Sequence, residues 1–184
     1  KALMKNRIKT MHYNSPLGRI LLAADEEGLT GLWFENSKYF GSNLPQEYRE
    51  SMNGVLRKTK RWLDIYFAGE NPDFLPPIHL IGTPFQKEVW KILLEIPYGK
   101  TTTYGEIAER LAKEKGIPRM SAQAVGGAVG HNPISILVPC HRVMGKNGSL
   151  IGYAAGLDKK LKLLEMEHIN RNSLCYPRGI KEKE

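Results

Sequence analysis

Cys140 is the residue whose neighbours most clearly suggest chemistry. It is one of two cysteines, it lies between Pro139 and His141, and it follows the largely apolar run 134–138. A cysteine in such a place can be a small buried hydrophobe, a metal ligand or a nucleophile. A thiol becomes a nucleophile when a neighbouring group removes its proton or stabilises its thiolate. His141 is the nearest candidate base, but the residue types alone leave all three interpretations open.

Glu167 is the candidate acid that would orient His141. Adjacent side chains on an extended segment point to opposite faces, so Cys140 and His141 need a bridging water or an irregular backbone to cooperate. A histidine base is commonly held by a carboxylate, as in a catalytic triad. Glu167 follows Leu163 and Leu164 by four and three residues, beside the apolar stripe of a predicted helix. An unpaired carboxylate there is unfavourable, so we expect Glu167 to have a partner.

The cysteines and histidines that could bind a metal ion have the wrong spacing for a structural site. The sequence offers Cys140, His141, His168 and Cys175, whereas structural zinc sites use ligands in closely spaced pairs. We therefore predict no metal site, and two cysteines do not form a disulfide framework. A thiol protease would use the same cysteine, histidine and acid, but the signatures of the common protease families are absent.

The charge of the chain favours a polyanionic partner. There are 27 Lys and Arg against 19 Asp and Glu in 184 residues, a formal net charge of +8. Nucleic acid is the first candidate, although many basic proteins bind none. No apolar run is long enough for a membrane helix, and the first ten residues lack the apolar core of a signal peptide. We therefore expect no membrane association and a cytoplasmic location.

The first part of the chain reads as a small sheet covered by a helix. Alternating and apolar segments at 7–13, 19–24 and 29–34 are separated by turn formers, which predicts a β-meander. Apolar residues between 55 and 67 recur at helical spacing. The stretch 69–77 carries three prolines and a glycine, which is typical of a linker. We predict a first domain over residues 1–76.

The second predicted domain, residues 77–184, is mostly helical. Thr83 with Gln86, and Thr103 with Glu106, form capping boxes that predict helix starts. A helix over 104–112, a breaker and a helix over 122–129 capped by Ser121 make the pattern of a helix-turn-helix. Helix pairs are common, so this pattern alone does not establish DNA binding. Spacing of apolar residues predicts a last helix whose packed face runs from residue 157 to 168.

Four stretches together resemble one known family. They are Asn132-Pro133 followed by VPCHRV at 138–143, FQKEVWKILLEIPYGKTTTYGEIA at 85–108, QAVGGAVGHNP at 123–133 and GYAAGLDKKLKLLEMEH at 152–168. Each is similar to a segment of the 6-O-alkylguanine-DNA alkyltransferases, also called methylated-DNA–protein-cysteine methyltransferases. The resemblance implies an α/β two-domain fold, with a small N-terminal β-sheet and helix and a mostly helical C-terminal domain that carries a winged helix-turn-helix.

The resemblance also implies a reaction. Cys140 matches the residue that irreversibly accepts a methyl or other alkyl group from the 6-oxygen of guanine in DNA, and also from the 4-oxygen of thymine. His141 matches a base that acts on Cys140 through water, and Glu167 the acid that orients it. Asn132 matches a hinge residue that braces the turns around the site. Each protein would act once, as a monomer, without a cofactor, on double-stranded DNA containing alkylated guanine, in the cytoplasm of a prokaryote near its nucleoid or in a nucleus.

Further residues match the substrate and DNA contacts of that family. Arg142 matches an arginine that holds the active-site structure. The residues that match the base pocket are Tyr104, Val143, Tyr153 and Ala154. Tyr104 also matches the residue that helps to rotate the nucleotide out of the stack. The residues expected to contact DNA are Tyr104, Ser121, Ala122, Gln123, Gly126 and Lys146.

One position departs from the family pattern. Many members have an arginine where this chain has Gln123, and that arginine fills the gap left by the flipped base. Glutamine is shorter and uncharged, which puts the affinity for the duplex in question. Three other interpretations stay open: a damage-binding relative without catalysis, a DNA-binding regulator, and a thiol hydrolase. Non-catalytic relatives lack the cysteine of this motif, so Cys140 argues against the first.

Overall fold

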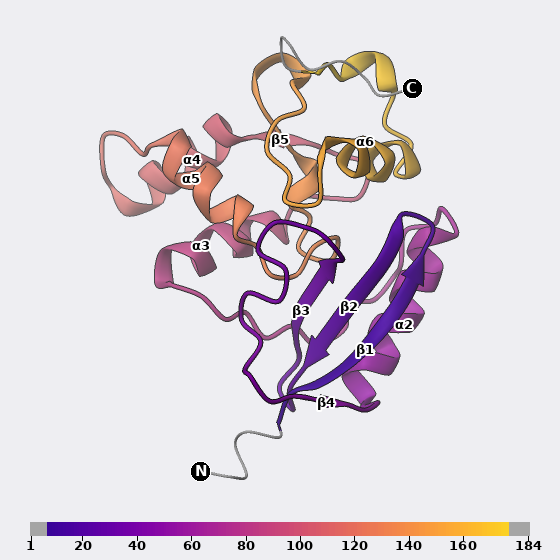
Figure 1. The fold of residues 1–184 in the computed structure, drawn as a ribbon. Coiled ribbons are helices and arrows are strands. Elements are labelled where there is room, and N and C mark those ends of the chain that lie inside the picture. Colours follow the sequence, from indigo (N-terminus) through magenta and orange to yellow (C-terminus); the bar gives the residue numbers. More distant parts are fainter. Residues whose placement is uncertain (1–6, 177–184) are drawn as a thin grey trace. The chain divides into compact units, whose positions relative to one another are not determined.

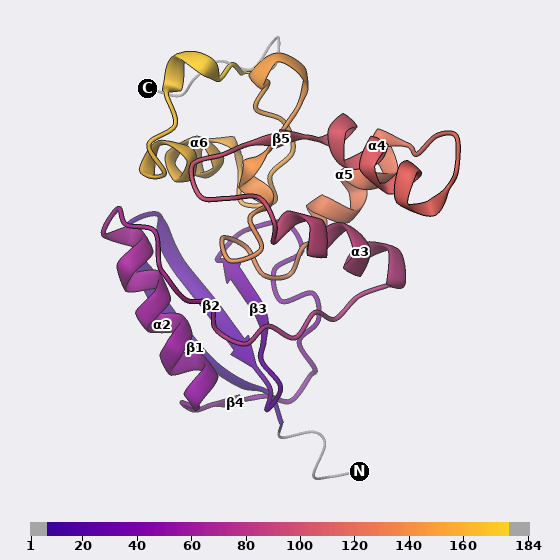
Figure 2. The same ribbon diagram turned by 180° about the vertical axis from the view of Figure 1, so that it is seen from behind.

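The computed structural model describes residues 7–176 of the chain (Figures 1 and 2). Residues 1–6 and 177–184, which the predicted domains include, lie outside the described part. The strands are β1 (Lys9–Ser15), β2 (Gly18–Ala24), β3 (Leu29–Phe34), β4 (Arg49–Glu50), β5 (Thr102–Thr103) and β6 (Val143–Met144). The α-helices are α2 (Gly54–Phe67), α3 (Pro84–Leu93), α4 (Tyr104–Lys115), α5 (Ala122–Gly130) and α6 (Leu157–Met166), and the short 3-10 helices are η1 (Cys140–Arg142), η2 (Lys146–Gly148) and η3 (Arg171–Ser173).

The chain forms two compact units. The first runs to Gly82 and takes in Pro133–Leu137, and the second contains Thr83–Asn132 and the chain from Val138 onward. The contacts thus divide the chain after Gly82 rather than after residue 76. The reason is that residues 77–79 remain attached to β3, where Leu29 donates to the carbonyl of Pro77 and accepts from the N–H of His79.

The first unit is built on a four-stranded sheet in the order β3–β2–β1–β4. β1, β2 and β3 pair antiparallel in sequence, which confirms the predicted meander. The short β4 pairs parallel with β1. β2 and β3 are almost entirely buried, because both of their faces are covered.

The helix α2 covers one face of this sheet (Figures 1 and 2). It begins at a cap in which the side chain of Asn53 accepts from the N–H of Leu56. Its buried residues lie at the predicted helical spacing and are Leu56, Thr59, Trp62, Leu63 and Tyr66. A separate apolar cluster contains Leu21, Ala23 and Trp33, with Ile8 and Leu44 packed against it. The predicted small sheet with one helix is therefore confirmed.

The segment Pro133–Leu137 adds to the sheet from far along the sequence. The N–H of Leu32 donates to the carbonyl of Pro133, and the N–H of Ser135 donates to the carbonyl of Leu32. Local sequence patterns carry no signal for this pairing, because it joins residues about a hundred positions apart. It fixes the chain to β3 immediately before the Cys140 motif.

The second unit contains the predicted helix pair. Both capping boxes form, Thr83 with Gln86 at the start of α3 and Thr103 with Glu106 at the start of α4. Gly116 ends α4 in the left-handed conformation, and Ser121 caps α5 by accepting from the N–H of Ala124. α4 packs against α5, and α5 packs against α3. The predicted pair of helices joined by a turn is confirmed, whereas its identity as a winged helix-turn-helix stays a prediction.

The last helix is shorter than its apolar spacing predicted. α6 ends at Met166, so Glu167 is its C-terminal cap residue, and His168 lies beyond it with a φ of 66°. His168 is exposed, which corrects the expectation that it continues the packed face. Leu161 and Leu164 form a buried cluster with Met144 and Leu150, as the rest of the stripe predicted. Among the described residues, none of the helices has the length and apolar character that spanning a membrane requires.

Candidate active site

Cys140 begins the short helix η1 and is only 6 % exposed. A tight turn precedes it, in which its N–H donates to the carbonyl of Val138 at 2.8 Å and Pro139 has φ −81° and ψ 64°. This is the geometry of an inverse γ-turn, which suits the fixed φ of proline. The turn and η1 supply the irregular backbone that an extended segment lacks.

A second, less favourable turn lies three residues earlier. The N–H of Leu137 donates to the carbonyl of Ser135 at 2.9 Å, and Ile136 between them has a φ of 71°. A β-branched residue in the left-handed region is strained by roughly 1–3 kcal/mol. Ile136 is buried in the first unit, whose packing holds this conformation in place.

Asn132 braces the loop that leads to Cys140. It is buried, and its Nδ2 donates to the carbonyl of Val138 at 2.8 Å. Burial raises the pKa of the Cys140 thiol, while a hydrogen bond from the Asn132 side chain acts against that effect. The backbone N–H groups of Cys140 and His141 also favour the thiolate. The predicted hinge residue therefore contacts both the turn and the nucleophile.

His141 and Glu167 form a buried pair, with both side chains fully inaccessible to solvent. The distance between His141 Nε2 and Glu167 Oε2 is 2.5 Å. Burial lowers the pKa of His141, so the imidazole is neutral near pH 7. An ionised carboxylate only accepts hydrogen bonds, so we assign the proton of the imidazole to Nε2. The lone pair then lies on Nδ1, which is buried and has no hydrogen-bond partner among the described residues.

Arg142 holds Glu167 in place and keeps it ionised. Its Nε donates to Glu167 Oε1 at 2.7 Å, and its Nη1 donates to the carbonyl of Ile96 at 2.7 Å. The N–H of Gly99 donates to the same carboxylate oxygen at 3.1 Å. Burial would raise the pKa of Glu167, but the hydrogen bonds and charges of His141 and Arg142 outweigh it and hold the pKa at about 2. The carboxylate is thus fixed as an acceptor.

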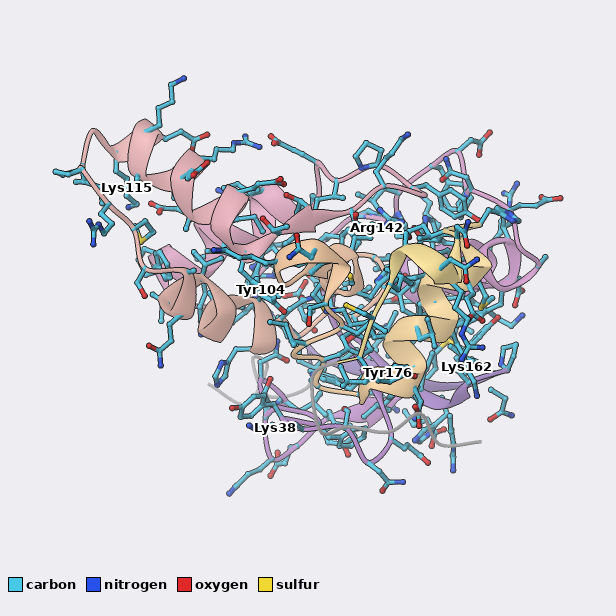
Figure 3. The ribbon with its side chains drawn as sticks, turned by 90° about the horizontal axis from the view of Figure 1, so that it is seen from above. Lys38, Tyr104, Lys115, Arg142, Lys162 and Tyr176 are labelled. Atoms are coloured by element: carbon cyan, nitrogen blue, oxygen red, sulfur yellow. The ribbon has the colours of Figure 1, made fainter. Side chains whose placement is uncertain are left out.

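Tyr104 stands at the first position of α4, at the opposite end from Lys115 (Figure 3). Its hydroxyl donates to the carbonyls of Ile151 and Gly152, at 3.1 and 3.2 Å. Its ring lies against Gly126 of α5, where an added Cβ would approach the ring carbons at 3.8 Å. Burial raises the pKa of Tyr104, and the Cys140 thiolate adds to this effect, so the two groups share one environment. Tyr104 therefore joins the helix pair to the loop before α6.

Two family models match this chain. One is described as the 6-O-methylguanine DNA methyltransferase, DNA binding domain, and covers residues 84–169; the other is the ribonuclease-like domain of the same family and covers residues 8–80. The chain belongs to the 6-O-methylguanine DNA methyltransferase family. The family predicted from the sequence is thereby confirmed.

Individual relatives agree with this membership. The methylated-DNA–protein-cysteine methyltransferase of Methanosarcina acetivorans is 48 % identical over 155 residues, which cover 84 % of this chain and 95 % of that protein. The crystal structure of the Mycobacterium tuberculosis O6-methylguanine methyltransferase matches with a TM-score of 0.73 at 42 % identity, over 87 % of this chain and 92 % of that one. The structure of Mycobacterium tuberculosis OGT in complex with DNA has a TM-score of 0.72 at 40 % identity, over 91 % and 94 % of the two chains.

The methyltransferase chain brings the four predicted catalytic residues together. Asn132, Cys140, His141 and Glu167 lie in one buried group, with Arg142 on the far side of the carboxylate. No direct hydrogen bond joins the Cys140 thiol to His141 in the described structure, and the bridging water stays a prediction. The described residues also contain no cluster of His, Cys, Asp or Glu that could hold a metal ion.

The residues predicted to form the base pocket lie on three different segments. Val143 is buried in β6, which pairs with β5 just before Tyr104. Tyr153 and Ala154 are half-buried in the loop that precedes α6. The hydroxyl of Tyr104 already contacts this loop at Ile151 and Gly152. Their role in binding guanine stays a prediction.

The residues predicted to contact DNA lie mainly at the start of α5. Ser121, Ala122 and Gln123 are exposed there, and Gly126 is half-buried against Tyr104. Lys146 is exposed but belongs to η2, outside the helix pair. Their contacts with DNA stay predictions as well.

Sequence reasoning missed two residues of the site. The backbone N–H of Gly99 gives no signal in a sequence, because its contact with Glu167 depends on a loop. Lys160 is buried on α6, and its Nζ donates to the carbonyls of Val143 and Ile151. Its position could have been noticed, since it lies three residues after Leu157 and four before Leu164, on the apolar stripe.

Proposed function

We propose that this methyltransferase repairs double-stranded DNA by moving a methyl group from the 6-oxygen of guanine to its own Cys140. The observation that carries the assignment of Cys140 is the buried pair His141–Glu167 beside it. Glu167 fixes the imidazole proton on Nε2, which leaves a neutral base with its lone pair on Nδ1. The relatives' names state the reaction class, and the site supplies an acceptor and a base to perform it.

The proposed reaction is one displacement. The thiol proton passes to Nδ1 of His141, through a water molecule because no direct hydrogen bond joins the two residues. The sulfur attacks the methyl carbon, a sulfur–carbon bond forms, and the bond from carbon to the guanine oxygen breaks with its electron pair on the base. The imidazolium that results lies against the ionised Glu167, which stabilises it at 2.5 Å. The guanine takes up a proton as it leaves, and the hydroxyl of Tyr104 is the candidate donor of that proton.

The product explains why we propose one turnover per protein. S-methylcysteine is a thioether with no good leaving group, and the site offers no residue that would return the sulfur to a thiol. The same displacement suits an alkyl group on the 4-oxygen of thymine, which we also propose as a substrate. We propose that the protein acts as a monomer and needs no cofactor.

Access to the base requires DNA to open. The 6-oxygen of guanine lies inside the base pair, so the nucleotide must rotate out of the stack, at a cost of a few kcal/mol. We propose that α5 approaches the duplex with Ser121, Ala122 and Gln123, and that Gly126 lets the helix lie close to the backbone. Lys146 would add a phosphate contact. Such a protein acts where DNA is, in the cytoplasm of a prokaryote or in a nucleus.

The test is a mass measurement on the intact protein. A duplex oligonucleotide with a single 6-O-methylguanine is incubated with the protein, and peptides are then mapped. We expect a gain of one methylene on the peptide that contains Cys140, saturating at one per protein. Cys175 is exposed and serves as an internal control, since chance alkylation would modify it first.

The alternatives give different results. Methylation of Cys175 instead of Cys140, or an unchanged mass with the lesion still in the DNA, would refute the assignment. A DNA-binding regulator would show sequence preference and no mass gain. A thiol hydrolase would turn over repeatedly on an ester or peptide.

A further inference from the structure

Lys160 is a buried lysine without a carboxylate partner. Its side chain is fully inaccessible to solvent, on the face of α6 that packs against η1. Its Nζ donates to the carbonyl of Val143 at 2.6 Å and to the carbonyl of Ile151 at 2.7 Å. Among the described residues, none of the Asp or Glu side chains forms an ion pair with it. Lysine is almost never fully buried unless its charge is compensated, so this position calls for a compensating group.

The residues around Lys160 indicate which group compensates its charge. On η1 they are Cys140 and His141, and on α4 the ring of Tyr104 lies with its centroid 5.9 Å from Nζ. The charges beyond His141 are those of Glu167 and Arg142, which are paired with each other at 2.7 Å. Among the described groups that face Lys160, Cys140 is thus the one that can form an anion with no other cation bonded to it, because Glu167 is paired with Arg142 and burial raises the pKa of Tyr104 well above its usual range.

Two hydrogen bonds connect the ammonium of Lys160 to the turn that carries the nucleophile. The N–H of Val143 donates to the carbonyl of Cys140 and so closes η1. The carbonyl of the same Val143 accepts from Lys160. One residue therefore links the turn that carries the thiol to the buried cation, so their separation is fixed by hydrogen bonds.

The electrostatics agree with this arrangement. The positive charge of Lys160 lowers the pKa of Cys140 against the effect of burial, and the thiolate favours the charged form of the lysine in return. Burial lowers the pKa of Lys160 to about 8, so the ammonium is charged at neutral pH and loses its proton just above it. The same charge disfavours protonation of His141 and so keeps the imidazole able to accept a proton.

We propose that Lys160 is the counter-ion of the Cys140 thiolate, a positioning residue whose charge stabilises the acceptor sulfur as its proton leaves. The inference rests on the proposed role of Cys140 as acceptor. A purely structural role would tie β6 to the loop at Ile151 through two carbonyls. A neutral donor would serve for that role, whereas the effect of Lys160 on the thiolate depends on its positive charge.

The experiment measures the thiol and needs no DNA. In a Cys175→Ser background Cys140 is the only cysteine, so the rate of its carbamidomethylation by iodoacetamide against pH reports its pKa. The variants are Lys160→Met, which removes the charge at similar length, and Lys160→Gln, which keeps a donor for the carbonyls. Lys162→Met is the matched control, because Lys162 is exposed on the same helix (Figure 3).

We expect both Lys160 variants to raise the pKa of Cys140 by about one unit, which means about tenfold slower alkylation below that pKa. In the parent protein Lys160 loses its proton above pH 8, so the stabilisation of the Cys140 thiolate should fall there. The Lys160 variants should not show this fall. Lys162→Met should match the parent. A folded Lys160→Gln variant with the thiol pKa of the parent would overturn the proposal.

A second measurement tests the coupling between Lys160 and Cys140 even if the Lys160 variants do not fold. The titration of Lys160 is followed by NMR through its side-chain carbon next to Nζ, in the parent and in Cys140→Ser. Removing the thiolate should lower the pKa of Lys160, and an unchanged lysine titration would refute the coupling. Neither measurement depends on methyl transfer, so failure here and failure of the proposed reaction are separate outcomes.

Discussion

Replacing Glu167 by Gln tests the charge and the proton position of the site at once. Glutamine keeps the size of the side chain and its carbonyl can still accept from Arg142 and from the N–H of Gly99. Its amide NH₂ group would then face His141 Nε2, which is 2.5 Å from the carboxylate oxygen that it replaces. Two donors cannot share one hydrogen bond, so the imidazole proton must move to Nδ1.

The pKa of Glu167 gives the size of the effect on stability. A fall from 4.5 to about 2 corresponds to about 3 kcal/mol at neutral pH, because one pKa unit is worth about 1.4 kcal/mol. Since burial keeps His141 neutral, its charge adds little, and we expect roughly 2–3 kcal/mol. Arg142, which is only 7 % exposed, would lose its counter-charge, and breaking a buried pair typically costs about 3–5 kcal/mol. We therefore predict a loss of about 3 kcal/mol.

The sign of the pH dependence follows from the lowered pKa. The folded-state value lies below the unfolded one, so the stabilisation is complete above about pH 4.5 and is lost as the pH falls through 4.5 toward 2. Protonated glutamate resembles glutamine in hydrogen bonding. The difference in unfolding free energy between parent and variant should thus shrink toward zero at low pH.

The effect on transfer follows from the tautomer. With the proton on Nδ1, the imidazole offers no lone pair where the thiol proton must go. By comparison with other enzymes in which an acid orients a histidine, we expect transfer to slow by about 10²–10⁴-fold. Binding to duplex DNA should stay the same, because Glu167 is buried away from the surface.

The assay combines urea unfolding from pH 3 to 8 with single-turnover transfer from a methylated duplex. Glu165→Gln is the control, since Glu165 is exposed on α6 and its ion pair with Arg171 is long at 3.8 Å. The reasoning is wrong if the loss of stability in Glu167→Gln is the same at pH 3 and pH 7. Equal transfer rates in parent and variant would remove Glu167 from the mechanism.

Two further predictions concern the DNA contacts. Gln123→Arg should tighten binding to a lesion-containing duplex by about tenfold, or about 1.4 kcal/mol, if the glutamine is a weaker occupant of the gap left by the flipped base; unchanged affinity in a fluorescence titration would mean that the gap is filled in another way. Tyr104→Phe removes the donor to the carbonyls of Ile151 and Gly152, so it should destabilise the protein by about 1 kcal/mol and slow transfer in a rapid-quench assay. Transfer at the parent rate would exclude Tyr104 as the proton donor.

The elements of the fold could be predicted from local signals. The capping boxes at Thr83 and Thr103 and the cap at Ser121 depend on residues within four positions of one another. The strands of the meander follow one another in sequence, so the turn formers between them mark where each strand ends. The addition of Pro133–Leu137 to β3 could not be predicted in this way, because that pairing joins distant segments. The end of α6 was also misplaced, since the apolar stripe continues in the sequence after the helix stops at Met166.

The site was predicted in outline for a different reason. Residue chemistry suggested that Cys140, His141 and Glu167 act together, and the resemblance gave each a role. The groups that sequence reasoning did not supply are the ones that act through the backbone or through burial: the N–H of Gly99, the carbonyls of Val143 and Ile151, and the ammonium of Lys160. A lysine on the apolar stripe of a helix indicates a position of interest, because burying its charge is unfavourable unless a partner compensates it.

The buried charges of the described residues all belong to this one site. They are the charges of Glu167, Arg142 and Lys160. The imidazole of His141, which is buried beside Glu167, is neutral. One carboxylate against two cations leaves an excess positive charge in a place where solvent cannot screen it. The thiolate of Cys140 places an anion near the uncompensated Lys160, while its proton stays in the site on His141 against Glu167, so the acceptor is stabilised most when its proton has left. The transfer consumes that anion and leaves a thioether, which has no good leaving group, in keeping with a nucleophile that is used once.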